Sequence, residues 1–310
     1  MKPAQFQYHK PQTISEAIQL LSHLENARLL AGGQTLVPML NFRVSAFDNI
    51  VDLGCIPELS TINENVDSLD IGSMVTQRML EYSSLVKEKL PLLSHAIKYV
   101  GHRQTRNRGT IGGSLCHLDP SAEIPLVALT LRASVEIAGP EGSRDAVISD
   151  FIEDMLTPAI SEHELVVKIK FPLRYMWNGW AFTEFSRRKG DFAIVAIACV
   201  MEMGTNGEVK DLVLAAGGLC EVPFRLEKIE DAIRGKKLNQ SLLASIFENG
   251  FSFDALDDVF APSWYRNRLA CTGAKRVLAE AYERCQSYQE LICLTKANKY
   301  PSLQPLMAKR

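Results

Sequence analysis

The 310-residue chain lacks the features that would place it in several simple classes of protein. No apolar run approaches the roughly 20 residues that a membrane-spanning helix needs. The opening residues Met1–Phe6 lack the apolar core of a signal peptide. A formal net charge of −2 gives no electrostatic basis for broad binding to nucleic acid or to an acidic membrane. We therefore expect a cytoplasmic protein that spans no membrane and binds no nucleic acid.

Cysteine is present but follows no pattern. The seven cysteines are scattered along the chain, and none forms a C-x-x-C pair. An odd, scattered set is typical of reduced thiols in a cytosolic protein. It argues against a zinc site or an iron–sulfur cluster held by this chain alone. We expect no metal ligands here and interpret most of these cysteines as small buried hydrophobes.

Two common nucleotide-binding signatures are also missing, because neither G-x-G-x-x-G nor G-K-[ST] occurs. Paired glycines occur instead in AGGQTL at 31–36 and in GTIGGS at 109–114. A pyrophosphate requires backbone N–H groups that converge on it with no Cβ atom in the way. Each glycine pair alone is compatible with a plain tight turn. The two together, each after an apolar run, predict a split dinucleotide cradle.

The chain is long enough for two or three domains, and its pattern changes once. Before residue 172 helical and strand patterns are mixed, beginning with a small βαβ-like unit. After a joint at 172–179 the pattern becomes one of long antiparallel strands followed by helices. In the first part we expect helices at 13–26, within 77–100 and at 122–131, and strands at 27–31, 49–53, 69–75, 135–138, 145–148 and 165–171. In the second we expect strands at 180–187, 193–203 and 209–216, and helices at 226–234, 241–249 and 263–284.

Four motifs give this chain a family resemblance. AGGQTL at 31–36, RNRGTIGGSLCHLDPSAE at 106–123, FTEFSRRKGDFAIV at 182–195 and SWYRNRL at 263–269 occur in this order. They resemble the FAD-binding medium subunit of molybdenum hydroxylases, the xanthine dehydrogenase and carbon monoxide dehydrogenase flavoprotein family. The resemblance covers about the first 270 residues, and four ordered motifs make it far more specific than either glycine pair.

The resemblance implies an α+β fold class. Residues 1–175 would form an FAD-binding domain of the vanillyl-alcohol-oxidase/PCMH type, made of two α+β subdomains at about 1–57 and 58–175. Residues 176–285 would form a C-terminal domain with a three-stranded antiparallel sheet and helices, followed by a tail at 286–310. One FAD would lie extended, non-covalently bound, between the two subdomains.

The same resemblance assigns the cofactor site by motif position. The pyrophosphate would be wrapped by Leu30, Ala31, Gly32, Gly33, Gln34, Thr35 and Leu36 and by Thr110, Ile111, Gly112, Gly113 and Ser114. His117 would lie close to FAD, and Asp119 and Glu123 would accept hydrogen bonds from ribose or ribityl hydroxyls. Val100 would line the flavin or adenine side, and Leu165 and Val166 would bring backbone near the adenine or the ring edge. No residue is expected to act as a catalytic acid, base or nucleophile.

Structural interpretations stand beside these assignments. His117 is compatible with an ordinary satisfied polar residue, Asp119 with a helix cap, and Glu123 with a first-turn helix carboxylate. We favour a structural salt-bridge cluster for Arg187, Arg188 and Asp191. The run Arg103, Arg106 and Arg108 is compatible with a solvated loop, with neutralisation of FAD phosphates or with a partner-facing surface. One departure is the segment 182–185, where some relatives have a lysine near the flavin and this chain has none.

By resemblance, the function is that of an FAD-binding subunit of a molybdenum-hydroxylase-type oxidoreductase. A large subunit would carry the molybdenum cofactor and a small subunit two [2Fe–2S] clusters, with a dimer of heterotrimers as the expected assembly. Electrons would pass from the clusters to FAD and then to NAD⁺, O₂ or another acceptor. The alternatives are a stand-alone flavin-dependent oxidase or reductase, for which Cys116 and His117 are covalent-attachment candidates, and a scaffold protein that has lost FAD.

Overall fold

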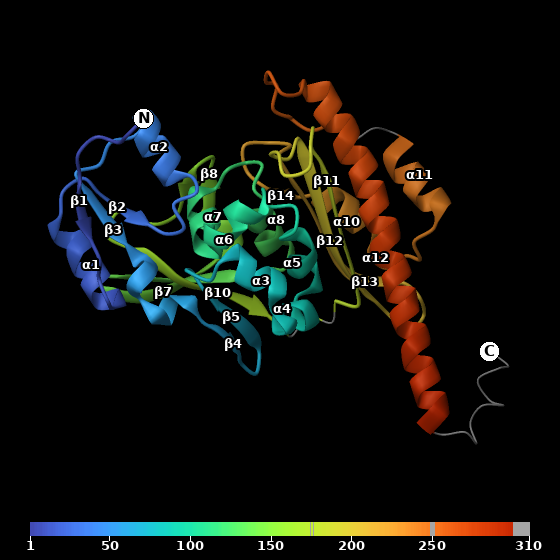
Figure 1. Cartoon of the computed structure of the whole chain (residues 1–310). Coiled ribbons are helices and arrows are strands. Elements are labelled where there is room, and N and C mark those ends of the chain that lie inside the picture. The colour runs from blue at the N-terminus through green and yellow to red at the C-terminus, as the bar shows by residue number, and fades with distance from the viewer. Residues whose placement is uncertain (174, 176, 249–251, 300–310) are drawn as a thin grey trace.

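The computed structural model describes residues 1–173, 175, 177–248 and 252–299, with side chains up to residue 290. Three main sheets lie in a row from the N-terminal part of the chain to the C-terminal part (Figure 1). Two of them belong to the part before the joint at 172–179, and the third follows it. Among the described helices, none combines the length and apolarity that crossing a bilayer requires.

The first sheet is small and entirely parallel, with the strand order β1-β3-β2. Its connections are helices because parallel neighbours need a crossover. Thr13 caps the first helix, its Oγ1 accepting the Glu16 amide at 3.1 Å. The elements are β1 (Gln7–His9), α1 (Ile14–His23), β2 (Ala27–Leu30), α2 (Leu36–Phe42) and β3 (Asn49–Asp52), followed by the 3-10 turns η1 (Leu53–Cys55) and η2 (Pro57–Ser60). The predicted opening βαβ unit is confirmed, although its first helix ends three residues earlier than expected.

The second sheet is antiparallel, with the strand order β4-β5-β10-β6-β7. The strands expected at 135–138 and 145–148 are present and form a hairpin, with Gly139 paired to Gly142. Its strands are β4 (Ile62–Glu64), β5 (Ser68–Gly72), β6 (Ser134–Gly139), β7 (Gly142–Val147) and β10 (Leu165–Pro172). Its helices are α3 (Gln77–Tyr82), α4 (Ser84–Lys89), α5 (Pro91–Ala96), α6 (Arg103–Arg108), α7 (Ile111–His117), α8 (Glu123–Thr130) and α9 (Ile148–Phe151), and a separate pair is β8 (Ile152–Asp154) with β9 (Thr157–Pro158).

The third sheet contains the three long antiparallel strands that the sequence predicts, and a short fourth strand extends it. Its central strands are buried on both faces, because α12 covers one face and α8, from the part before the joint, lies against the other. This explains why residues 195–203 are almost continuously apolar. The elements are β11 (Gly179–Phe185), β12 (Val195–Met203), β13 (Val209–Gly217), β14 (Phe224–Arg225), α10 (Glu227–Ile233), α11 (Gln240–Glu248) and α12 (Ser263–Lys299).

Helix α12 is longer than the sequence predicts. The expected helix ended at residue 284, with a tail of no clear core face from 286, but α12 continues to Lys299. Its far end projects past the rest of the protein (Figure 1). Apolar residues at helical spacing occur only where a helix packs against the rest of the protein. The part of α12 that extends beyond the third sheet has no such spacing, so the sequence did not predict it. Residues 300–310 of the expected tail lie outside the described residues.

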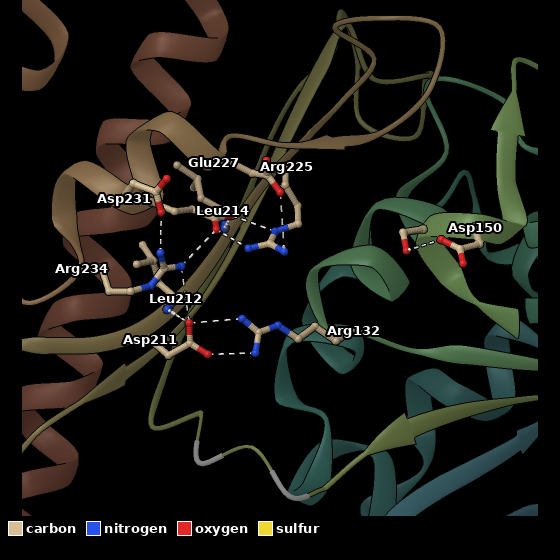
Figure 2. Close-up of polar contacts among 11 residues, drawn as sticks. Arg132, Asp150, Asp211, Leu212, Leu214, Arg225, Glu227, Asp231 and Arg234 are labelled. Atoms are coloured by element: carbon tan, nitrogen blue, oxygen red, sulfur yellow. Dashed lines mark hydrogen bonds and ion pairs between the residues drawn. The ribbon is translucent and has the colours of Figure 1, made fainter.

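An ion pair joins the second and third sheets. Arg132 follows α8 and reaches Asp211 on β13 at 2.9 Å, as Figure 2 shows. Its guanidinium also lies 4.8 Å from the ring centre of Tyr175 and 5.2 Å from that of Trp177. The aromatic contacts keep the cation partly desolvated, which strengthens both kinds of interaction.

We expect Arg132→Met to lower the free energy of unfolding by about 1 kcal/mol, because both partners keep 26% of their side-chain surface exposed and water screens the pair. Urea unfolding of the full chain measures this. Lys210→Met, which removes a more exposed pair with Glu202, is the control and should change the midpoint little. A loss for Arg132→Met above about 3 kcal/mol would mean that the pair behaves as a buried one.

Candidate functional site

The two glycine segments predicted from the sequence meet in space. A Cβ atom added to Gly32 would lie 2.0 Å from the carbonyl oxygen of Arg108 and 2.9 Å from the Cα of Gly109. A Cβ added to Gly113 would lie 3.4 Å from that of Ala31. The backbone after β2 is therefore packed directly on the backbone between α6 and α7. Only glycine permits this approach at Gly32, because no side chain fits between two main chains.

A cavity of about 350 Å³ opens beside this contact. It is lined by Leu30, Gly32, Gly33 and Gln34, by Val37, Pro38 and Asn41 of α2, and by Arg108. Gly33 adopts the left-handed conformation (φ 73°). Within the described residues, the amides of Gly33, Gln34 and Thr35 donate to no acceptor. Successive amides around a left-handed residue make a concave donor surface that suits an anion.

The second glycine segment uses its amides internally. Ile111 N donates to Val75 O at 3.1 Å, Gly112 N to Ser73 O at 2.9 Å, and Gly113 N to Thr110 Oγ1 at 3.1 Å. The amide of Ser114 likewise donates to Thr110 O at 3.2 Å. A Cβ on Gly112 would lie 2.5 Å from the Cβ of Ser73. In this structure the second pair therefore serves close packing, whereas the first pair carries the free donors.

The basic run before the second glycine segment divides into two kinds of residue. Arg106 is internal: its Nε donates to Glu81 at 3.1 Å and its Nη1 to the carbonyls of Val100 and Gly101 at 3.0 and 3.1 Å. Arg108 is exposed and lines the cavity. The run is a short helix, α6, rather than a solvated loop.

The predicted salt-bridge cluster of Arg187, Arg188 and Asp191 is wrong for the part of the chain that the structure describes. Arg187 donates to the carbonyl of Phe260 at 2.9 Å, and Asp191 contributes its amide to the carbonyl of Arg188 at 3.1 Å. No ion pair links these three side chains within the described residues. All three residues are exposed and lie between β11 and β12, and the Arg187 guanidinium also lies 5.6 Å from the ring centre of Phe260.

Cys116 and His117 end α7 and are half-buried. Burial raises the pKa of the Cys116 thiol to about 12, so it is a poor nucleophile at neutral pH. Burial also lowers the pKa of His117, which Asp119 partly opposes, and the imidazole is therefore neutral at pH 7. Asp119 Oδ1 accepts a hydrogen bond from the Ser121 amide at 2.8 Å, which is a local turn contact. Asp119 is not the helix cap, because the N-cap of α8 is Ala122 and it makes no side-chain cap hydrogen bond.

Glu123 is the first residue of α8 and only 8% exposed. Burial, followed by the nearby carboxylate of Glu184, raises its pKa to about 8. Its own backbone amide and the charge of Arg106 lower this pKa only in part, and among the described residues no ion pair to its side chain is formed. A carboxyl group this deeply buried is either protonated or receives a hydrogen bond from a bound ligand.

The remaining predicted positions lie around this centre but contribute differently. Val100 is half-buried and packs on the core below α5. Leu165 and Val166 are buried core residues at the start of β10. The next residue of β10 connects this strand to the second glycine segment through backbone hydrogen bonds. The Ser73 amide donates to Val167 O at 2.9 Å, and the Gly112 amide donates to Ser73 O at 2.9 Å. Leu36 begins α2 and is not among the residues that line the cavity.

Three residues near the site were not predicted from the sequence. Ser73 Oγ and Gln77 Oε1, which adjoin Gly112 and Gly109, are buried and without a partner among the described residues. Glu184 Oε2, on β11, is in the same condition. Buried polar atoms without partners are rare, and each requires an explanation. No local sequence signal marks Ser73 or Gln77, whereas Glu184 lies within a motif that the resemblance already singled out.

The chain matches two families along its length. Residues 4–174 match the FAD binding domain in molybdopterin dehydrogenase, and residues 180–281 match the CO dehydrogenase flavoprotein C-terminal domain. The glyceraldehyde dehydrogenase medium chain of Sulfolobus acidocaldarius is 33% identical over 87% of this chain and 95% of its own. The xanthine dehydrogenase FAD-binding subunit of Escherichia coli O157:H7 is 31% identical over 88% of this chain and 95% of its own.

Solved structures agree with these matches. A chain of carbon monoxide dehydrogenase from Hydrogenophaga pseudoflava superimposes with a TM-score of 0.88 at 32% identity, covering 92% of this chain and all of that one. The family resemblance predicted from the motifs is thereby confirmed, as are the fold class and FAD as the cofactor. This chain belongs to the family of FAD-binding medium subunits of molybdenum-hydroxylase-type oxidoreductases.

Proposed function

We propose that this chain accepts electrons from the [2Fe–2S] clusters of a small partner subunit and passes them through FAD to NAD⁺, O₂ or another acceptor. A large partner subunit would carry the molybdenum cofactor and the substrate, within a dimer of heterotrimers. The single observation that carries the proposal is the contact of Gly32 with the backbone of Arg108 and Gly109 beside an open cavity. It joins the two family motifs into one cradle.

The residues present fit FAD. Gly32 and Gly33 keep the cradle free of side chains, and the amides of Gly33, Gln34 and Thr35 supply donors for phosphate oxygens. Arg108 adds a positive charge at the cavity wall. The unpartnered atoms Ser73 Oγ, Gln77 Oε1 and Glu184 Oε2 are what a protein shows when a polar ligand completes its hydrogen bonds.

We further propose cofactor contacts for the whole set assigned by the motifs. Residues 30–36 would hold the pyrophosphate mainly through backbone amides, and residues 110–114 would hold the opposite wall in place. Asp119 and Glu123 would accept from hydroxyl groups, and the neutral His117 would pack close to the cofactor. Val100, Leu165 and Val166 would provide apolar surface or backbone around it.

The bound flavin supplies the redox chemistry, because it can take electrons singly and release them as a pair. The chain's own residues bind it, orient it and exclude water.

The high pKa of the Cys116 thiol argues against covalent attachment at that residue and so against the stand-alone oxidase that the sequence left open. Cys55, Cys116, Cys199, Cys220 and Cys285 are free thiols, which fits a reducing compartment, and we propose the cytoplasm.

An absorption spectrum of the purified full chain tests the proposal. We expect a flavin spectrum, and we expect acid precipitation to release the pigment as FAD into the supernatant. Mixing the reduced iron–sulfur partner with the chain should then bleach the flavin. Pigment that stays in the pellet would contradict non-covalent binding, and a colourless chain that takes up no added FAD would contradict the cofactor site.

A further inference from the structure

Four large apolar side chains are exposed at one end of the third sheet. Phe192 lies in the connection between β11 and β12, Val259 and Phe260 precede α12, and Trp264 is in the first turn of α12. Each of the four keeps between 63% and 90% of its surface exposed. A group of exposed apolar side chains on a folded protein usually marks a place where another molecule binds.

Two arginines hold these segments together. Arg187 of the β11–β12 connection donates to the carbonyl of Phe260 at 2.9 Å, and its guanidinium lies 5.6 Å from the centre of that ring. Arg266 of α12 donates to the carbonyl of Ile194 at 2.5 Å and pairs with Asp258 at 2.7 Å. The two segments therefore lie side by side, next to the start of α12 (Figure 1).

The loop that presents Val259 and Phe260 is held in one conformation. Asp258 Oδ1 accepts hydrogen bonds from the amides of Phe260 at 2.8 Å and Ala261 at 2.9 Å, and its Oδ2 accepts one from the buried Arg266. The two apolar side chains are thus exposed on a fixed loop. A surface that already has its binding conformation loses little conformational freedom when a partner associates.

Exposed cations adjoin these apolar side chains. Arg187, Arg188 and Lys189 are consecutive and exposed, and Arg103 is exposed at the start of α6. Among the described residues, none of these four cations forms an ion pair. The β11–β12 connection contains one carboxylate, Asp191, against its three cations. An excess of one charge at a surface attracts a partner of the opposite charge and steers its approach.

The same surface lies close to the cofactor cavity. A Cβ added to Gly190 would lie 2.5 Å from ring atoms of His102, which is the N-cap residue of α6. The β11–β12 connection is therefore packed against the start of α6. A helix of six residues is about 9 Å long. Its last residue, Arg108, lines the cavity that we assign to FAD, so the two places are one short helix apart.

We propose that these four cations and four apolar side chains form the docking surface for the iron–sulfur subunit, whose matching surface would be acidic around an apolar centre. This inference rests on the proposed function, because electrons reach FAD only from a donor that is held close to it. Of the two partner subunits, the electron donor is the one that needs this closeness. A second copy of this chain does not fit, because a symmetric contact would set the same cations against one another.

Reversal of two of these charges should slow the association. We expect Arg188→Glu/Lys189→Glu to lower the association rate with the reduced iron–sulfur subunit about tenfold or more at low salt. The difference from the unchanged chain should shrink as salt is added, because ions screen exposed charges. Stopped-flow recording of flavin bleaching, with the FAD-loaded full chain and several concentrations of the partner, measures the rate.

Lys236→Glu/Lys237→Glu is the matched control, because it changes the net charge by the same amount. Lys236 and Lys237 are exposed, and Lys237 Cε would lie 3.7 Å from a Cβ on Gly207 in the turn between β12 and β13. That turn is at the opposite end of β12 from the proposed docking surface. We expect this control to change the association rate by no more than about twofold.

Loss of an apolar side chain should act on dissociation instead. We expect Val259→Ser to speed dissociation of the iron–sulfur subunit about three- to tenfold, because the complex no longer buries that side chain. Val66→Ser is the control: Val66 is a similarly exposed valine between β4 and β5, and its loss should leave dissociation unchanged. Surface plasmon resonance with the immobilised full chain measures both rates.

FAD content and reduction of the flavin by dithionite should be the same in all these variants, so that a slower transfer reports docking alone. Unchanged association of Arg188→Glu/Lys189→Glu at low salt, together with unchanged dissociation of Val259→Ser, would overturn the inference and leave the proposed function intact. So would a variant that loses the large subunit and keeps the iron–sulfur subunit. An unchanged chain whose flavin the reduced iron–sulfur subunit never bleaches would overturn both.

Discussion

The Gly32→Ala chain is expected to be purified without FAD and to bind added FAD at least about 100-fold more weakly. The new Cβ would fall 2.0 Å from the carbonyl oxygen of Arg108, and backbone cannot turn aside as a flexible side chain does. Relieving this overlap requires separation of the strand–turn segment from the α6–α7 connection, which costs about 1–3 kcal/mol. It also displaces the amides of Gly33, Gln34 and Thr35 from Arg108 and the opposite wall, so binding falls more than stability.

Fluorescence titration with FAD and the flavin-to-protein absorbance ratio measure this effect. Gly235→Ala is the control, because Gly235 has φ 77° and nothing within 4 Å of an added Cβ. It should lose about 1 kcal/mol of stability from left-handed strain and retain FAD. If Gly32→Ala kept its flavin, the close backbone contact would not be what forms the cradle.

The sequence predicts much of this architecture because the signals are local. The turn at Gly139–Gly142, the cap at Thr13 and the alternation in β10 each depend on neighbouring residues, and the hairpin, the start of α1 and β10 lie within a few residues of their expected positions. The fourth strand, β14, is only two residues long and carries no such signal. The full length of α12 could not be predicted either, because the part of the helix that extends beyond the sheet needs no apolar face.

The candidate site shows where sequence reasoning stops. The glycine pairs identify two segments, but nothing local reveals that one pair keeps its amides free and the other uses them on Ser73 and Val75. That division depends on which backbones meet. Glu184 was visible only as a departure from a lysine-bearing motif. Its Oε2 is buried without a partner among the described residues, and β11 packs through Phe182 against a domain that ends before residue 175 in the sequence.

Arg266→Met is expected to lower the free energy of unfolding of the full chain by about 3–5 kcal/mol. Arg266 is 4% exposed, and its Nη1 donates to the carbonyls of Ile194 and Gly218 at 2.5 and 2.7 Å. Its Nη2 pairs with Asp258 at 2.7 Å. One guanidinium thus joins three segments, which explains why arginine stands at this place in the SWYRNRL motif. Methionine fills the volume but leaves the carbonyls of Ile194 and Gly218 without their donor. Asp258 loses its cation and keeps only the amides of Phe260 and Ala261.

We expect the same substitution to weaken FAD binding as well. Gly218, which Arg266 holds through its carbonyl, donates its amide to Pro120 O at 2.7 Å, directly between Asp119 and the start of α8. We therefore expect FAD affinity to fall several-fold along with stability, measured by urea unfolding and FAD titration under one buffer condition. Arg268→Met, an exposed arginine two residues later on α12, should change neither by more than about 0.5 kcal/mol. A destabilised Arg266→Met chain with unaltered FAD affinity would show that the C-terminal domain loosens without disturbing Pro120. The Gly218–Pro120 hydrogen bond would then carry no coupling between this clamp and the site.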